Sequence, residues 1–482
     1  VFRVNAVEVR PNFKVTNQII KESWALNPVV GVGPNKFSEL WNLHKPLSVN
    51  MEEFWNYEFK FGSSLVGTLA ATTGPLGLLS VSIFAVLYLF LGYKSLSKKQ
   101  ETEKYAISNI YFLVSLLFWL ACFVYIPGVE VLSLCCIFTA IFISTLVSRD
   151  LIQKREVVFF GDSNKNFLQI LILLILIIAL LFLGLLVIRR NVSNFLFNKG
   201  VISMANADIE NAKAHIVSAI KITPTDLYWR ALSEVTLAEL SKSLEGVSSL
   251  ESIESVKIVE IQAIVSNAIQ AAKSAVSING TDYKNWLTLA GVYESLSSLG
   301  VEGALQNAKE TYGEAQKRMP TSPEIPLALA RLEMLSGNTN NAREEVSKAL
   351  ELKNNYTDAY FTLARIEAAS NNIKEAIRSI ELATATDPNN YNLYLQLGLM
   401  KYNNNDFVGA IAAFEKVIIL VPDYANAKYF LGLSYEKIGK TEEAIKQFEE
   451  IEQTNPENSE VKFIISNLRS GRDPFYKAEP PI

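Results

Sequence analysis

The amino-acid sequence predicts an all-α protein in which polytopic membrane helices are followed by an α-solenoid. Two observations carry this prediction. The first 190 of the 482 residues contain four long apolar segments without Lys or Arg, and the sequence from Pro323 onward repeats every 34 residues. Residues 191–482 bear the charge pattern of soluble helices. The length allows two or three domains, and the composition divides them near residue 190.

Four segments are predicted to cross the membrane. The first lies in the uncharged stretch 61–93, with its strongest run at Leu76–Tyr93, and the others are Tyr105–Ile126, Val129–Ser148 and Phe167–Ile188. Each is long enough to span, or nearly span, about 30 Å of hydrocarbon. The alternative, buried core helices of a soluble protein, is disfavoured because none of the four segments has a polar face. The segments therefore define a membrane domain at residues 63–190.

The distribution of Lys and Arg predicts the orientation. Two loops are basic and flank the short Pro127–Gly128 turn, which has no basic residue; their cations are Lys94, Lys98, Lys99, Lys104, Arg149, Lys154, Arg155 and Lys165. Basic loops stay in the cytoplasm. Residues 1–62 and the C-terminal region are then extracytoplasmic, although Arg189 and Arg190 oppose this orientation. We expect a multi-pass protein of the bacterial inner (cytoplasmic) membrane.

The repeat in the second half has a recognisable pattern. Two units, which start near Tyr391 and Ala425, share a pattern of large, Leu, small, Ala, aromatic and Pro positions. The residues of this pattern in the first of these units are Tyr394, Leu397, Gly398, Ala410, Phe414 and Pro422. In the second unit they are Leu431, Gly432, Tyr435, Ala444, Phe448 and Pro456. This pattern resembles the tetratricopeptide repeat, a helix-turn-helix unit. The small residues let two helices approach closely, and Pro ends the second helix.

Three looser units precede the regular ones, and the second carries an insertion over residues 244–261. We therefore predict about seven helix pairs over residues 191–470, with a capping helix at 459–470 that covers the last apolar face. The Pro-rich tail 471–482 is expected to be flexible.

The resemblance to tetratricopeptide repeats implies a concave groove that binds a protein partner of unknown identity. Aromatic and Arg side chains supply most interface hot spots. The residues predicted for the groove are Arg331, Phe361, Arg365, Leu395, Tyr402, Tyr429 and Lys437. The alternative for each of them is ordinary solenoid surface.

The N-terminal region has a distinctive order of features. Arg10 precedes an amphipathic stretch, Asn17–Leu26, which is followed by a turn containing Gly31, Gly33 and Pro34; a polar loop then leads to the sequence ATTGPLG at 71–77 and the first span. This order resembles the C-terminal part of the O-antigen ligase/polymerase family of membrane glycosyltransferases, some of which carry tetratricopeptide repeats. The resemblance covers about residues 7–190.

The resemblance implies a metal-independent transfer of a glycan from an undecaprenyl-diphosphate carrier to an acceptor hydroxyl. Arg10 would pair with the diphosphate, and Gly31, Gly33 and Pro34 would form the substrate loop. The catalytic His of the family is absent, because Ser63, Ser64 and Leu65 stand where it should fall, and Thr72 replaces a common Glu. His44 lies in the same loop about 20 residues earlier. It is the second catalytic candidate, and a solvated loop residue is the alternative.

Whether the chain is an enzyme therefore stays open. The two hypotheses are a glycan ligase that acts on a lipid-linked substrate, and a catalytically inactive scaffold whose groove recruits envelope proteins. The net charge of −4 argues against nucleic acid as a partner. No cofactor or metal is expected, since Cys122, Cys135 and Cys136 all lie inside apolar segments. The absence of an initiator Met suggests that further N-terminal sequence precedes Val1.

Overall fold

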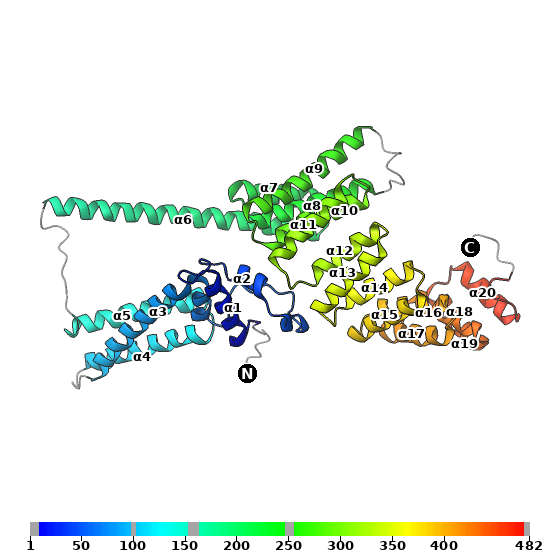
Figure 1. The fold of residues 1–482 in the computed structure, drawn as a ribbon, viewed down its shortest axis with the longest axis horizontal. Coiled ribbons are helices and arrows are strands. Elements are labelled where there is room, and N and C mark those ends of the chain that lie inside the picture. Colours follow the sequence, from blue (N-terminus) through cyan, green and yellow to red (C-terminus); the bar gives the residue numbers. More distant parts are fainter. Residues whose placement is uncertain (1–8, 98–102, 153–162, 246–254, 477–482) are drawn as a thin grey trace. The chain divides into compact units, whose positions relative to one another are not determined.

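A computed structural model describes residues 9–97, 103–152, 163–245 and 255–476. Every regular element within these ranges is helical, and Figure 1 shows their order along the chain. The chain divides into two units, residues 1–321 and residues 322–482.

The N-terminal region forms a small helical layer with its own core. It contains α1 (Phe13–Leu26), α2 (Phe37–His44) and the 3-10 helix η1 (Leu47–Met51). Asn12 begins α1 by accepting a hydrogen bond from the backbone N–H of Val15 at 2.9 Å. The rings of Trp41 and Phe59 meet edge to face at 4.8 Å, and Ile19 and Phe37 are fully buried beside them. The region that the sequence suggested as a loop is thus packed.

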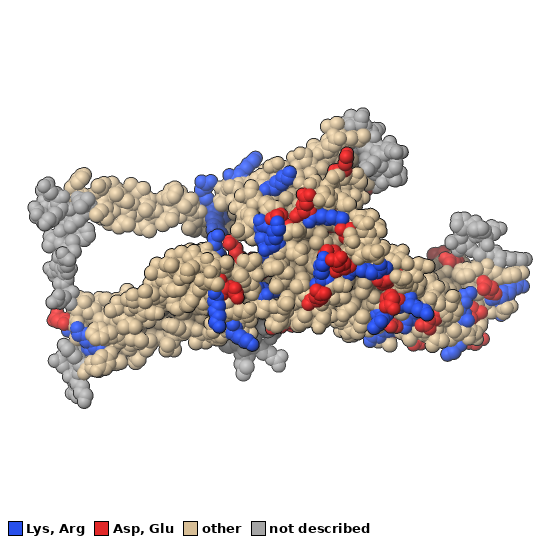
Figure 2. All heavy atoms as spheres, viewed as in Figure 1, with Lys and Arg blue, Asp and Glu red and all other residues tan. Residues whose placement is uncertain are grey.

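Four helices are long and apolar enough to cross a membrane, as the sequence predicts. They are α3 (Leu65–Ser97), α4 (Glu103–Val124), α5 (Val129–Ser148) and α6 (Ser163–Ala205). Figure 2 shows Lys, Arg, Asp and Glu spread over the solenoid helices, whereas the surfaces of α3–α5 and of the first part of α6 are nearly bare in this view. Their bounds differ from the predicted spans, because α3 begins earlier and breaks at Gly74, and α6 continues past Ile188.

Helices α3, α4 and α5 pack around aromatic side chains. Tyr88, Phe112 and Phe142 form the centre of this cluster, and the Tyr88 hydroxyl lies 2.5 Å from Ser115 Oγ. At the other end, Arg149 donates to the Ser95 hydroxyl at 2.7 Å and to the Ser95 carbonyl at 3.2 Å, so it caps the C-terminus of α3. Polar groups buried among these helices therefore have partners from a neighbouring helix.

Helix α6 joins the fourth apolar segment to the solenoid without a linker. Its second half packs on α7 (Ile209–Ile222), where Arg189 donates to the Ile222 carbonyl at 2.7 Å and Ser193 donates to the Ala219 carbonyl at 2.8 Å. Arg189, which opposed the predicted orientation, thus caps the C-terminus of α7. The fourth apolar segment and the first solenoid helix are one continuous element.

The solenoid contains seven consecutive helix pairs within the described residues. The pairs are α6 with α7, α8 (Asp226–Leu244) with α9 (Ser255–Ile278), α10 (Tyr283–Ser298) with α11 (Ala304–Arg318), α12 (Glu324–Leu335) with α13 (Thr339–Leu352), α14 (Thr357–Ala369) with α15 (Ile373–Thr386), α16 (Tyr391–Asn403) with α17 (Phe407–Leu420), and α18 (Ala425–Lys437) with α19 (Thr441–Thr454). A last helix, α20 (Ser459–Arg469), covers α19.

Small residues let the two helices of a pair meet, as the repeat pattern predicts. A Cβ built on Gly398 would lie 2.5 Å from the Phe414 ring, and one on Gly432 would lie 2.8 Å from the Phe448 ring. Phe414 and Phe448 are fully buried. Each of these aromatic rings therefore occupies the space that the glycine leaves.

The border between the two units falls after residue 321, inside the solenoid. Within the first unit the N-terminal layer contacts the third helix pair: Glu58 accepts from Lys284 at 2.6 Å, and Asn50 donates to the Thr321 carbonyl at 2.8 Å. These contacts tie residues 1–62 to α10 and to the segment after α11. The domain boundaries that the sequence suggests stay predictions.

Part of the C-terminal tail is held in place. Asn467 on α20 donates to the carbonyls of Pro474 at 2.9 Å and Tyr476 at 3.2 Å, and Pro474 is buried. Residues 477–482, for which flexibility is predicted, lie outside the described residues, as do Lys98, Lys99, Lys154 and Arg155 of the basic loops.

Candidate functional site

The most unusual backbone feature in the first unit is a break in α3. Gly74 has φ 65° and ψ −169°, and Pro75 follows it inside the helix. Proline has no N–H, so the Ala71 carbonyl loses its donor. The neighbouring carbonyls of Ala70 and Thr72 also lose their regular partners because the helix changes direction here. In an apolar setting every such group needs a new partner.

Helix α1 supplies two of the missing donors. The Ser23 hydroxyl donates to the Ala71 carbonyl at 2.5 Å, and the Trp24 indole N–H donates to the Ala70 carbonyl at 2.9 Å. Ser23 is fully buried. Both side chains lie in the last turn of α1, and α1 packs directly on α3.

The loop after α1 completes the set. The Gly33 N–H donates to the Thr72 carbonyl at 2.8 Å, and the Leu76 N–H donates to the Val29 carbonyl at 3.1 Å. The loop thus pairs with both sides of the break, as a short strand would. The carbonyls of Ala70, Ala71 and Thr72 and the Leu76 N–H thus all have partners from α1 or the loop that follows it, and the break is a built feature of the fold.

The predicted turn residues have backbone roles at this break. Gly31 and Gly33 have φ values of 64° and 105°, a region that favours glycine, and Gly31 is buried against Gly74. Pro34 is exposed at the far end of the turn. The two glycines therefore hold the loop against α3, and they present no side chain to a substrate.

Arg10 lies at the N-terminal end of α3. Its guanidinium donates through one terminal nitrogen to the carbonyls of Ser63 at 3.0 Å and Val124 at 3.1 Å. Val124 is the last residue of α4, so Arg10 supplies a positive charge at a helix C-terminus. The residue is nevertheless exposed, which leaves the rest of the guanidinium open to solvent.

His44 ends α2 and is half-buried. Its Nδ1 lies 3.8 Å from Glu22 Oε2, whereas its buried Nε2 has no hydrogen-bond partner among the described residues. No hydrogen bond or ion pair between described residues joins His44 to Arg10. The structure therefore places the two catalytic candidates in separate surroundings.

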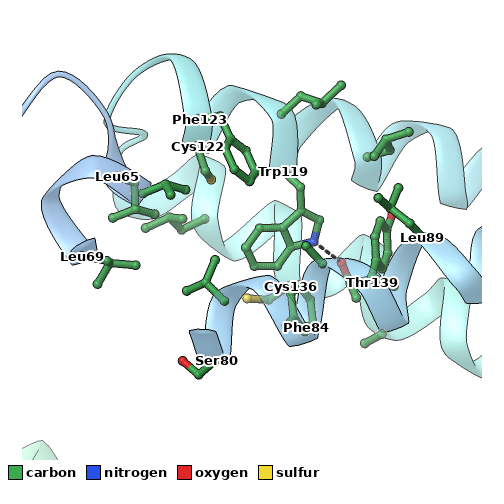
Figure 3. A pocket seen from close by; sticks show the side chains of 18 of the residues that line it. Leu65, Leu69, Ser80, Phe84, Leu89, Trp119, Cys122, Phe123, Cys136 and Thr139 are labelled. Carbon is green, nitrogen blue, oxygen red and sulfur yellow. Dashed lines mark hydrogen bonds between the residues drawn. The ribbon is translucent and has the colours of Figure 1, made fainter. Parts of the chain in front are cut away.

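A large apolar cavity lies between α3, α4 and α5 (Figure 3). Its volume is about 850 Å³, and its lining includes Leu65 and Leu69 before the helix break, and Phe84 and Leu89 after it. The Trp119 indole, which also lines the cavity, donates to Thr139 Oγ1 at 3.0 Å, so its polar atom is satisfied. Such a lining suits a hydrocarbon chain.

Arg10 binds two carbonyls whose residues are close in sequence to lining residues of this cavity. The carbonyls that it binds belong to Ser63 and Val124, which directly flank the segments containing the lining residues Leu65 and Phe123. The Leu65 N–H also donates to the Tyr125 carbonyl at 3.2 Å, which closes α3 against the end of α4.

The second unit carries the residues predicted for a groove on the first helices of its pairs. Arg331 on α12 and Arg365 on α14 are exposed, and Phe361, one turn before Arg365, is half-buried. Within residues 322–476 no ion pair joins either arginine to a carboxylate, so both guanidinium groups are available to a ligand.

The other predicted groove residues differ in availability. Tyr402 is half-buried, and its ring meets those of Phe407 at 5.4 Å and Phe430 at 5.9 Å. The Tyr429 hydroxyl donates to Glu460 Oε1 at 2.7 Å. Burial is the main cause that raises the pKa of both tyrosines, so both stay neutral hydrogen-bond donors at physiological pH.

Lys437 and Leu395 lie at the two extremes of exposure. Lys437 is exposed in the last turn of α18. Leu395 is only 8% exposed and packs with Phe414, Ala427 and Leu431, so it belongs to the core between two repeats. The prediction of Leu395 as a groove residue is therefore wrong, because its side chain is not accessible to a partner.

Comparison with known proteins assigns the repeats. One tetratricopeptide repeat model matches residues 333–398, and a second matches residues 395–459. Residues 333–459 are tetratricopeptide repeats. No curated protein shows significant similarity to the chain.

Solved structures, two of them described as tetratricopeptide repeat (TPR) proteins, are similar to part of the chain. A crystal structure of MamA is 26% identical over 34% of this chain and 95% of its own, with a TM-score of 0.30. YrrB, described as a TPR protein with an unusual peptide-binding site, is 18% identical over 39% of this chain and 95% of its own, with a TM-score of 0.32. A TPR protein from Parabacteroides merdae is 17% identical over 58% of this chain and 99% of its own, with a TM-score of 0.36.

Ser23, Trp24 and Lys284 are structurally important residues that sequence reasoning missed. A signal for the first two exists, because Pro75 stands in a long uncharged segment and must leave carbonyl groups that need donors. A Ser-Trp pair at the end of a preceding amphipathic helix is a plausible source of such donors. No local signal points to Lys284, since its partner Glu58 is 226 residues away.

Proposed function

We propose that the chain is a membrane-anchored TPR protein that binds a protein partner in the groove formed by α12, α14, α16 and α18. The observation that carries this proposal is the TPR assignment of residues 333–459, since TPR stacks act through binding surfaces. Exposed Arg331, Arg365 and Lys437 and half-buried Phe361 and Tyr402 support it, because Arg and aromatic side chains are frequent interface anchors.

The apolar helices supply the anchor in this proposal. Four of them have the length and composition of membrane spans, and α6 runs without interruption from the apolar segment into the first helix pair. The solenoid would then project directly from the bilayer. The distribution of Lys and Arg supports an inner-membrane location with the repeats outside the cytoplasm. The protein would serve as a scaffold for envelope complexes.

Partner capture with matched variants tests this function. Full-length protein in detergent is immobilised, and proteins retained from an envelope extract are compared for wild type, Arg365→Ala, Tyr402→Ala and Lys374→Ala. Lys374 is an exposed cation on the second helix of the same repeat as Arg365, so it is the control. We expect a partner that both groove variants lose and Lys374→Ala keeps. Equal capture by all four proteins would contradict a groove function.

A second candidate function is transfer of a lipid-linked glycan, and one observation favours it. The apolar cavity of about 850 Å³ lies among the membrane helices, and Arg10 binds carbonyls next to one end of its lining. A carrier lipid would place its hydrocarbon chain in the cavity and its diphosphate near Arg10. His44 would serve as the acid or base, and the loop of Gly31, Gly33 and Pro34 would border the substrate.

Two variants of Arg10 separate catalysis from a structural role. If Arg10 only caps α4, Lys should partly replace it. The glycan-transfer activity of Arg10→Ala and of Arg10→Lys should then fall only as far as the stability of each variant falls. As a diphosphate ligand, even Arg10→Lys should lose transfer while the melting temperature stays near wild type. Lys14→Ala, an exposed change on α1, is the control. His44→Ala should lower transfer about 100-fold or more if it is the acid or base. Wild-type protein that transfers no glycan would reject this function.

A further inference from the structure

Several cations in the second unit have an acidic partner on a neighbouring helix. Arg343 pairs with Glu367 at 2.6 Å, Lys401 with Glu381 at 2.7 Å and Lys428 with Glu450 at 2.8 Å, and these pairs join helices of the stack. Arg331 and Arg365 differ, because both are exposed and neither has an ion pair with a described residue. Both guanidinium groups are therefore open to an external anion.

The two arginines hold equivalent positions in neighbouring repeats. They are 34 residues apart, one full repeat, and each lies in the middle of the first helix of its pair. Helices α12 and α14 are in direct contact. Packed helices have axes about 8–10 Å apart, so the two side chains start about 10 Å from one another along the groove.

Acidic residues repeat with the same spacing. Glu324 precedes Arg331 by seven residues, and Asp358 precedes Arg365 by seven residues. Seven residues are two helical turns, so each acidic residue shares a face with its arginine about 10 Å along the helix axis. The groove therefore carries a negative edge at the start of α12 and α14 and a positive line at their centre.

We propose that this part of the TPR groove recognises an extended peptide segment with two acidic residues three positions apart. In the polyproline II form of an extended chain there are three residues per turn and a rise of about 3.1 Å per residue, so residues three apart share one face and are separated by about 9 Å, close to the spacing expected for Arg331 and Arg365. A guanidinium fork binds a carboxylate with two charge-assisted hydrogen bonds. This inference rests on the proposed function and names the partner's chemistry.

The negative edge restricts how the peptide lies. A third acidic residue placed beside Asp358 would meet a like charge, so the flanking part of the segment should be neutral or basic. Phe361 lies one turn from Arg365 on the same helix, and a partner apolar residue between the two acidic ones can contact its ring. The recognised segment thus contains an acidic residue, then two spacer residues of which one is apolar, and then a second acidic residue.

A display library of random decapeptides tests this pattern. The full-length chain in detergent is the bait, with wild type, the double variant Arg331→Glu/Arg365→Glu, and the control Lys374→Glu selected in parallel. We expect peptides with two acidic residues three apart to be enriched on wild type and on Lys374→Glu, and to be lost on the double variant. For a synthetic enriched peptide, Arg365→Ala should weaken binding about tenfold or more. High salt should weaken binding as well.

The outcomes separate this inference from the proposed function. Enriched peptides without an excess of acidic residues, or acidic peptides that bind the charge-reversed variant equally well, would overturn the acidic partner and leave a peptide-binding groove in place. Failure to enrich any peptide above an unrelated bait would overturn both. A spacing other than three, with binding still lost on the double variant, would reject the geometry argued from α12 and α14. Circular dichroism of the double variant verifies that its helices remain.

Discussion

Gly31 and Gly74 lie backbone against backbone, although 43 positions separate them in the sequence. A Cβ built on Gly74 would lie 2.4 Å from the Gly31 nitrogen, and one built on Gly31 would lie 2.7 Å from the Gly74 nitrogen. Both have φ values near 65°, which side chains disfavour. The loop can reach the broken helix only because neither residue has a side chain.

Substitution of either glycine should therefore unfold this junction. Gly74→Ala adds a strained backbone conformation and a backbone clash, and we expect a loss of about 2–4 kcal/mol. The melting temperature of the purified protein in detergent measures it. Gly291→Ala on α10 is the control, because nothing lies within 4 Å of its added Cβ. That change should be neutral or stabilise by about 0.5–1 kcal/mol. Equal melting temperatures for Gly74→Ala and wild type would show that the loop does not need this contact.

The glycine-aromatic contact within a repeat gives a second prediction. In Gly398→Ala the new Cβ would lie 2.5 Å from the Phe414 ring, so the helices of that pair must move apart. We expect a loss of about 1–3 kcal/mol, as for overpacked cores. The double variant Gly398→Ala/Phe414→Leu should lose less free energy of unfolding than the sum of the losses in the two single variants, because the smaller side chain relieves the clash. Thermal unfolding of the four proteins measures the coupling, and strict additivity would contradict the packing described here.

The Arg343–Glu367 pair predicts a pH effect on the second unit. The hydrogen bonds from Arg343, at 2.6 and 3.1 Å, lower the pKa of Glu367, with a smaller contribution from Asn372. A lowered pKa means that the stabilisation is present above the unfolded-state value of about 4.3 and disappears as the pH falls through the lower folded-state pKa.

Glu367→Gln should remove that part of the pH dependence. We expect the variant to be less stable than wild type by about 1–2 kcal/mol at pH 7, and the difference to shrink at pH values near and below 4. Unfolding at both pH values is the measurement. Glu375→Gln is the control, because Glu375 is an exposed residue 3.9 Å from Arg378. A constant difference between Glu367→Gln and wild type at all pH values would rule out ionisation of Glu367 as its cause.

The predicted orientation of the apolar helices can be tested by labelling. In a cysteine-free background, Lys437→Cys should react with a membrane-impermeant maleimide in intact cells whose outer layers are permeabilised, because the basic loops are predicted to lie in the cytoplasm and the repeats on the other side. Lys98→Cys should react only after the inner membrane is opened. The reverse pattern would place the TPR groove in the cytoplasm.

The repeat positions could be predicted from the sequence because the burial of each one depends mainly on residues nearby in the chain. Gly398, Ala410 and Phe414 recur at fixed spacing, and all three are buried, since each repeat must fill the same space against its neighbours. The exposed Arg331 and Arg365 follow from the same register. Leu395 shares the register and yet is buried, because its exposure depends on the size of residues contributed by the next repeat, such as Leu431.

Composition and period by themselves determined the four apolar helices, the helix pairs and the register of the groove, since hydrophobicity and repeat spacing are properties of nearby residues. Only the tertiary structure decided that α3 breaks at Gly74, that Ser23 and Trp24 satisfy its free carbonyls, and that Arg10 caps α4. The physical reason is that a backbone group freed by Pro75 can accept from any donor that the fold brings near it. Which donor arrives depends on how α1 packs against α3, and no short stretch of sequence contains that information.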